Sequence, residues 1–176
     1  MRAIQLPDGA RLSTYVDGPA QAPVTAVLVH GLSVTAALWR SHVPLLLHEG
    51  IRVVRYDHRA HGNSTRGTAA LNLDQLADDL AQVLDSTAPQ GPLVLAGHSM
   101  GAMTVMLLVA RHPRLAPRIR GLLGAVTAAE AHAYADGLSA HVSLGIPTPA
   151  DIPARARRRP AAAVPPSKPP AQRRLL

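Results

Sequence analysis

The sequence lacks cysteine altogether and contains very few aromatic residues. Among its 176 residues there is no Cys and no Phe, with one Trp and three Tyr. The absence of Cys excludes disulfide bonds and thiolate metal sites. A core without large aromatic side chains depends on Leu, Val and Ala, whose burial yields less free energy per residue. We therefore expect a core of marginal stability.

Long apolar runs are also missing from the sequence. No stretch is long enough to span a membrane, and residues 1–18 contain no apolar run of signal-peptide length. These absences predict a cytoplasmic protein without a membrane span. The length predicts one domain that is large enough to bury a core.

The positive charge is concentrated at one end of the chain. The formal net charge is +7. Residues 1–150 hold 11 Arg against 10 acidic residues, a net charge of +1, whereas residues 151–176 hold six Arg and Lys168 against Asp151, a net charge of +6. The net charge of the whole chain therefore describes its tail and says little about the partners of the rest.

What the sequence does contain is a serine between a strand pattern and a helix pattern. The short apolar run 93–96 is typical of a strand buried on both faces. A G-x-S-x-G motif follows at 97–101, and then apolar residues recur at helical spacing: Met103, Met106, Leu107 and Ala110. A serine on such a sharp turn has a strained backbone that exposes its hydroxyl, and glycines fit beside it because they lack a Cβ. The pattern predicts Ser99 as a nucleophile, with the Met100 N–H at the positive helix end where an oxyanion would form.

The chain before this motif shows further strand patterns. Residues 1–6 and 11–16 predict two strands joined by a turn, and the β-branched run 24–29 predicts a central parallel strand. That run ends in His30-Gly31-Leu32, followed by a helical stretch around 39–47. A glycine at this position lets the backbone approach a substrate, so the Leu32 N–H is a candidate second oxyanion donor.

A polar loop and a long amphipathic helix follow the next strand, 51–56. In the loop 57–64, we expect Asp57 to pair with Arg59 and Ser64 to cap the chain that follows. His48, His58 and His61 fit no metal-ligand spacing, and we expect no metal site. Residues 71–86 predict a helix with Asn72 as its N-cap. We expect its acidic residues to form solvated surface, away from an apolar stripe of Leu73, Leu76, Ala77, Leu80, Val83 and Leu84.

The alternation of strands and helices from 24 to 112 predicts a parallel α/β sheet with right-handed crossovers. Residues 24–112 resemble the front half of an α/β-hydrolase of the esterase, lipase and peroxidase-like group. The motifs that carry the resemblance are VLVHGL at 27–32, Trp39, YDHRAHGNS at 56–64, LADDLAQVLD at 76–85 and LVLAGHSMGA at 93–102. Ala60 stands where this family usually has glycine, and a positive φ there would cost alanine about 1–2 kcal/mol.

The resemblance implies a mostly parallel sheet with helices on both faces and a small-molecule acyl substrate, with no cofactor. By matching position, it implies Ser99 as the nucleophile and the Leu32 and Met100 N–H groups as the oxyanion hole. The dehalogenase and epoxide-hydrolase branches of the same fold resemble this chain but have aspartate at the serine position.

The pattern fades towards the C-terminus. We expect residues 1–126, which end in a strand at 118–126, to form the hydrolase core. Residues 127–145 are uncertain and compatible with one helix at 128–140. Residues 146–176 read as a disordered tail, because Ala, Pro and Arg supply 18 of the last 26 residues. We expect this tail to be solvated and to have no nucleic-acid partner, since no aromatic residue accompanies its charges.

The remaining members of a catalytic triad are not assigned by the sequence. The resemblance implies an acid and a histidine on loops after later strands, and no such strands are visible. Asp136 with His141, or Glu130 with His132 or His141, are weak candidates because their spacing is too short. The C-terminal third therefore looks missing or replaced, and a frame change in a GC-rich gene is one hypothesis. The prediction is a serine hydrolase of carboxylic esters or related acyl compounds; the alternative is a catalytically incomplete fragment or pseudoenzyme.

Overall fold

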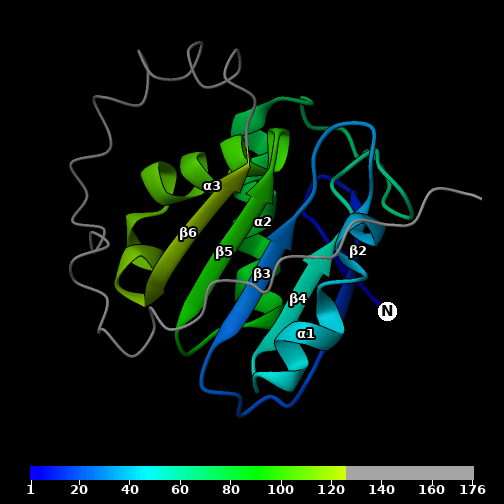
Figure 1. Cartoon of the computed structure of the whole chain (residues 1–176). Coiled ribbons are helices and arrows are strands. Elements are labelled where there is room, and N and C mark those ends of the chain that lie inside the picture. Colours follow the sequence, from blue (N-terminus) through cyan, green and yellow to red (C-terminus); the bar gives the residue numbers. More distant parts are fainter. Residues whose placement is uncertain (126–176) are drawn as a thin grey trace, which may run out of the picture. The chain divides into compact units, whose positions relative to one another are not determined.

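Six strands form one sheet in residues 1–125, the part of the chain that the computed structural model describes (Figure 1). Their order across the sheet is β1-β2-β4-β3-β5-β6. The strands are β1 Arg2–Gln5, β2 Arg11–Asp17, β3 Thr25–Val29, β4 Arg52–Tyr56, β5 Leu93–His98 and β6 Ile119–Ala125. Each lies where the sequence predicts a strand.

The sheet is mostly parallel, as predicted. The neighbouring pairs β4–β3, β3–β5 and β5–β6 are parallel, while β1 and β2 form an antiparallel hairpin whose second strand pairs with β4. Val29 lies opposite Gly97 and Leu28 opposite Arg55. The carboxyl ends of β3, β4 and β5 therefore meet at one edge of the sheet, which is where ligands bind in open α/β sheets.

Helices lie on both faces of the sheet (Figure 1). Helices α2, Leu73–Thr87, and α3, Met100–Arg111, pack on one face, and the 3₁₀-helix η1, Ala36–Trp39, with α1, Val43–His48, packs on the other. A second 3₁₀-helix, η2, Pro113–Arg118, leads into β6. The helical stretch predicted around 39–47 is thus two short pieces, because Pro44 has no N–H and fits only the first turn of a helix.

Helix α2 matches its prediction except at one acidic residue. The Asn72 side chain accepts a hydrogen bond from the Gln75 N–H at 2.8 Å, as expected of an N-cap. The predicted apolar stripe is buried apart from Leu73, which is half-buried. The prediction that the acidic residues form solvated surface is wrong for Asp79, which is only 1% exposed.

The apolar residues whose spacing predicts helix α3 are not the ones that are buried. Met103, Met106, Leu107 and Ala110 are only half-buried. The buried residues are Gly101, Ala102, Thr104, Val105, Leu108 and Val109. Because this helix is apolar almost all round, its periodicity identified a helix but not the face that packs on the sheet.

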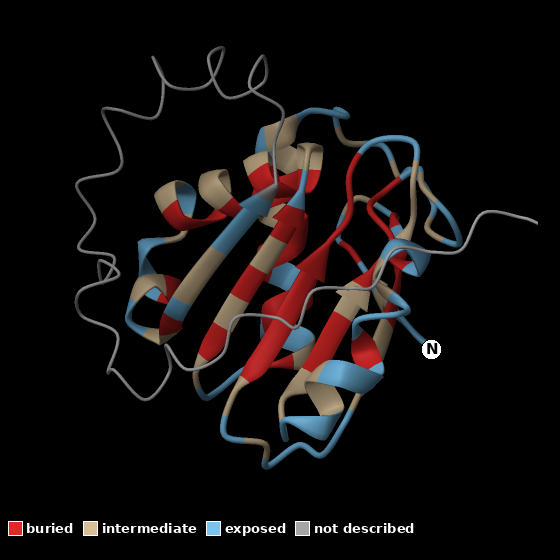
Figure 2. Cartoon of the chain, viewed as in Figure 1, coloured by how far each residue is buried: buried red, intermediate tan, exposed pale blue. Residues whose placement is uncertain are grey.

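Strand β5 is fully buried on one face only, contrary to the prediction. Leu93 and Leu95 point into the main core beneath α2 and α3, whereas Val94 and Ala96 are half-buried (Figure 2). The second face is packed mainly around β3 and β4, where η1 and α1 lie. Beside them is an apolar hollow of about 450 Å³, lined by Leu28, Trp39, His42, Leu45, Leu46, Ala96, Gly97, Leu123 and Gly124.

Several predictions concern residues outside the described part of the chain. These are the helix at 128–140, the tail at 146–176 and the weak triad candidates Glu130, His132, Asp136 and His141. Within residues 1–125, no helix is long and apolar enough to cross a membrane.

Candidate functional site

Ser99 lies on a sharp turn between β5 and α3. Strand β5 ends at His98 and α3 begins at Met100, so the whole reversal takes place at one residue. Ser99 has φ 51° and ψ −121°, a conformation that costs a side-chain-bearing residue about 1–3 kcal/mol. Its carbonyl oxygen accepts a hydrogen bond from the Ala102 N–H at 2.8 Å. The helix thus holds the serine in a strained geometry.

Two glycines allow the helix to pack this closely against the sheet. A Cβ on Gly101 would clash with the Val29 carbonyl oxygen and lie 2.6 Å from the His30 carbonyl oxygen. A Cβ on Gly97 would lie 2.5 Å from the Ala102 Cα. Both clashes are with backbone atoms, which cannot move aside cheaply. The glycines of the G-x-S-x-G motif are therefore required by the packing of the turn.

The loop after β3 touches the same turn. A Cβ on Gly31 would lie 2.8 Å from the His98 Nδ1 atom and 3.2 Å from the Ser99 Cβ atom. The next residue, Leu32, carries one of the two predicted oxyanion donors, and this residue is 65% exposed. Met100, which carries the other, begins α3, so its N–H belongs to the first turn, where N–H groups have no partner within a helix.

Two buried histidines hold this loop to the end of β4. The His58 N–H donates to His30 Nε2 at 2.9 Å, so the His30 proton lies on Nδ1, which donates to the Gly31 carbonyl at 2.7 Å. His58 Nε2 in turn donates to the His30 carbonyl at 3.1 Å, and its Nδ1 accepts from the Tyr56 hydroxyl at 3.2 Å. Burial lowers the pKa of His30 and lowers that of His58 well below its usual value. Both rings therefore stay neutral and serve as fixed connectors.

Asp57 holds the far end of the same loop. Contrary to the prediction, Asp57 does not pair with Arg59. Its Oδ1 accepts a hydrogen bond from the Ala36 N–H at 2.8 Å, and its Oδ2 accepts one from the Asn63 N–H at 3.0 Å. Ser64 does not cap a helix: its hydroxyl donates to the Asp57 carbonyl at 2.7 Å. The loop from 30 to 36 is thus fastened at one end by histidines and at the other by a buried carboxylate.

Arg59 is the largest fully buried side chain and has different partners from those predicted. Its guanidinium binds both carboxylate oxygens of Asp79, at 2.6 and 2.7 Å, and donates to Asp8 at 2.7 Å and to the Arg66 carbonyl at 3.0 Å. The hydrogen bond from Arg59 lowers the pKa of Asp8 to about 2. This cluster of Arg59, Asp79 and Asp8, the buried ion cluster, ties the loop to α2 and to the β1–β2 hairpin.

The sequence contained a signal for this cluster. Asp79 follows Leu76 by three residues and precedes Val83 by four, so helical spacing places it on the buried stripe. A carboxylate on a buried stripe needs a cationic partner. Ala60, next to Arg59, stands where the family usually has glycine. Its φ is 60°, so alanine has the positive φ that glycine would adopt without strain.

The loop edge, defined as residues 30–36, 57–64 and 97–101, therefore combines a half-buried serine turn with a buried polar frame. The serine lies on the strained turn, with the Gly31 loop packed against it and the start of α3 directly after it. Within residues 1–125, no cluster of His, Cys, Asp or Glu is arranged to hold a metal ion. Acyl transfer is the chemistry that such an arrangement can support without a cofactor.

Comparison with known proteins gives matches of the same kind. A family model described as "alpha/beta hydrolase fold" matches residues 26–162. The bifunctional esterase/perhydrolase DCH of Acinetobacter calcoaceticus is 40% identical over 96 residues, which is 54% of this chain and 34% of that protein. Epoxide hydrolase B of Mycobacterium tuberculosis is 33% identical over 120 residues, 66% of this chain and 32% of that protein.

A solved structure agrees with the fold. A carboxylesterase structure from the Thaumarchaeon Nitrososphaera gargenis superimposes with a TM-score of 0.64 at 25% identity, over 70% of this chain and 44% of the other. The chain spans about a third of the length of the two curated relatives above and less than half of this structure.

Proposed function

The chain belongs to the alpha/beta-hydrolase family, and we propose that it is a serine hydrolase that acts on carboxylic esters or related acyl compounds through Ser99. The observation that carries the proposal is the strained Ser99 turn, with the Gly31 loop packed against it. Esterase and epoxide-hydrolase relatives both match this chain. Serine at the turn favours ester chemistry, because its hydroxyl forms an acyl-enzyme that water can hydrolyse.

In the proposed reaction, the Ser99 Oγ atom attacks the substrate carbonyl carbon while a general base takes the hydroxyl proton. The carbonyl oxygen becomes an oxyanion, which the Leu32 and Met100 N–H groups bind. The intermediate then expels the alcohol, which leaves with the proton, and an acyl group stays on Ser99. Water attacks this ester by the same route and releases the carboxylic acid.

The buried frame of the loop edge has a positioning part in this proposal. Oxyanion donors are effective only when they are fixed before the charge develops. The His30–His58 hydrogen bonds and the Asp57–Ala36 hydrogen bond hold the Leu32 loop at both ends. No metal ion or cofactor is part of the proposed mechanism.

A catalytically incomplete chain is the second candidate. It is motivated by the acid and the histidine of a triad, for which the sequence patterns of residues 1–125 assign no residue. Without these groups, a serine and an oxyanion hole retain only a small part of the acceleration of a complete triad. The two candidates share one fold and one nucleophile and differ in the rate they predict.

Hydrolysis of p-nitrophenyl acetate and butyrate distinguishes the two candidates. A complete enzyme loses about a thousandfold or more of its kcat/KM in Ser99→Ala, whereas the exposed control Ser41→Ala keeps its activity. An incomplete chain shows no difference between wild type and Ser99→Ala. In that case, in-frame fusion of the C-terminal third of an esterase relative is expected to raise the rate by orders of magnitude; no gain in the fusion would contradict both candidates.

A further inference from the structure

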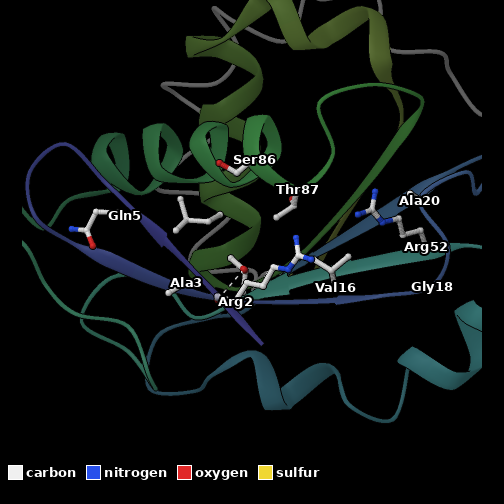
Figure 3. Close-up of a pocket in the computed structure, with 11 residues that line it drawn as sticks. Arg2, Ala3, Gln5, Val16, Gly18, Ala20, Arg52, Ser86 and Thr87 are labelled. Atoms are coloured by element: carbon white, nitrogen blue, oxygen red, sulfur yellow. Dashed lines mark hydrogen bonds between the residues drawn. The ribbon is translucent and has the colours of Figure 1, made fainter.

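A polar groove lies away from Ser99, between the β1–β2 hairpin and the end of α2 (Figure 3). It has a volume of about 640 Å³. Arg2 from β1 and Arg52 from the start of β4 line it, with Ser86 and Thr87 from the last turn of α2. Because Arg52 is the first residue of β4, the groove lies towards the amino ends of the parallel strands, opposite the loop edge.

Of the eleven arginines in residues 1–125, four form an ion pair with a carboxylate, and the two arginines of the groove are among the seven that do not. Arg55, Arg59, Arg111 and Arg114 each form an ion pair with a carboxylate. Within residues 1–125, the guanidinium groups of Arg2 and Arg52 have no such partner. The Nε atom of Arg52 is buried without a hydrogen bond, as is that of the paired Arg55. Figure 3 shows the Arg2 guanidinium group beneath Thr87 and the Arg52 side chain to one side of Thr87. No Asp or Glu is among the residues that line the groove.

We propose that this groove binds a phosphate monoester. A guanidinium group binds phosphate oxygens through two parallel N–H bonds, and two guanidinium charges match the charge of about −2 on a phosphate monoester. Ile4 and Val16 line the same groove and offer apolar contact to the organic part of the ligand.

The end of α2 opposes this proposal electrostatically, but only in part. The C-terminus of a helix carries about half a negative charge, which two full guanidinium charges exceed. If the arginines served only to stabilise the helix end, they would bind no ligand. This alternative makes a different prediction for the titration described next.

The test is a titration of the full-length protein with phenyl phosphate, inorganic phosphate and acetate, followed by amide NMR and calorimetry. We expect phenyl phosphate to shift the Ser86 and Thr87 amide signals and to bind more tightly than acetate. Arg52→Gln should weaken binding about tenfold or more, and Arg2→Gln should also weaken it. Arg52→Lys, which keeps the charge but loses the paired N–H groups, should fall between. The exposed control Arg40→Gln should bind as wild type does.

Equal affinity of Arg52→Gln and wild type would overturn the proposal, because it would place binding elsewhere, for instance on the basic tail. Acetate binding as tight as that of phenyl phosphate, or no binding at all, would overturn it as well. If Arg52→Gln does not fold, the wild-type Ser86 and Thr87 signals decide: unshifted signals overturn the proposal. None of these outcomes depends on ester hydrolysis, so the proposal stands or falls separately from the function of Ser99.

Discussion

The loop edge and the apolar hollow lie on neighbouring parts of the same sheet. They differ in how completely their polar groups are hydrogen-bonded and their apolar side chains are buried. At the loop edge, buried polar groups such as His30, His58 and Asp57 have hydrogen-bond partners from several elements. In the apolar hollow, Leu45 and Leu123 are 68% and 63% exposed, and the buried Trp39 Nε1 atom has no partner within residues 1–125.

Because of this difference, the geometry of the site and the stability of the fold depend on different parts of the molecule. The hydrogen bonds described above for the frame that holds the Leu32 loop all join residues within 1–125. The free energy of unfolding draws on both faces of the sheet, and one of them leaves large aliphatic side chains in contact with water. Substitutions in the two regions should therefore have unequal effects.

The largest loss of stability should come from the buried ion cluster. Arg59→Leu leaves Asp79 buried without a cation and should lower the free energy of unfolding by about 3–5 kcal/mol. Urea unfolding followed by Trp39 fluorescence measures this loss. The control Arg114→Leu breaks an exposed pair with Asp85 and should cost less than about 1 kcal/mol. An equal loss of unfolding free energy in the two variants would mean that the buried ion cluster stabilises the fold no more than an exposed ion pair does.

Gly101→Ala should have the next largest effect, because the new Cβ meets the Val29 and His30 carbonyl oxygens. We expect a cost of about 3 kcal/mol, at the upper end of the range for overpacking. The matched control is Gly121→Ala on β6, where a Cβ would meet only side-chain atoms of Val94 at 3.8 Å and should be tolerated. A neutral Gly101→Ala would contradict the packing described for the turn.

A gain of stability is expected at the one loop position that departs from the family pattern. Ala60→Gly removes the strain of a φ of 60° and should raise the free energy of unfolding by about 1 kcal/mol. Ala70→Gly, at an exposed residue without a positive φ, should instead lower it by up to about 1 kcal/mol through the entropy of the unfolded chain. If both variants lowered the free energy of unfolding, the result would contradict backbone strain at Ala60.

The smallest effect on unfolding should come from the apolar hollow. Leu123→Ser removes an exposed leucine and should change the free energy of unfolding by less than about 0.5 kcal/mol. Binding of the dye ANS and aggregation on heating should both decrease, because an exposed apolar surface has been reduced. A loss of several kcal/mol would show instead that this leucine is buried in solution.

The sequence was informative where a pattern depends on local chemistry. The G-x-S-x-G motif and the β-branched run before His30 predicted the strands, the turn and the start of α3 correctly. Asn72 was identified as an N-cap because its side-chain oxygen has one obvious local use. Local signals of this kind do not depend on which other elements are nearby.

Features set by contacts between distant residues were predicted poorly. The partners of Arg59 come from positions 51 and 20 residues away in the chain, and the loop sequence alone favoured the adjacent Asp57. The buried face of α3 could not be read from a helix that is apolar nearly all round. The open face of β5 was missed for a related reason: an apolar strand predicts burial but does not say whether a helix covers each side.

Labelling with a fluorophosphonate tests the central claim, that Ser99 is an activated nucleophile, most directly. The reagent forms a covalent bond with an activated serine and needs no turnover. The account predicts one adduct per chain, located by mass spectrometry on the peptide that contains Ser99 and absent from Ser99→Ala. No adduct in the wild type, or equal labelling of the alanine variant at another serine, would contradict it.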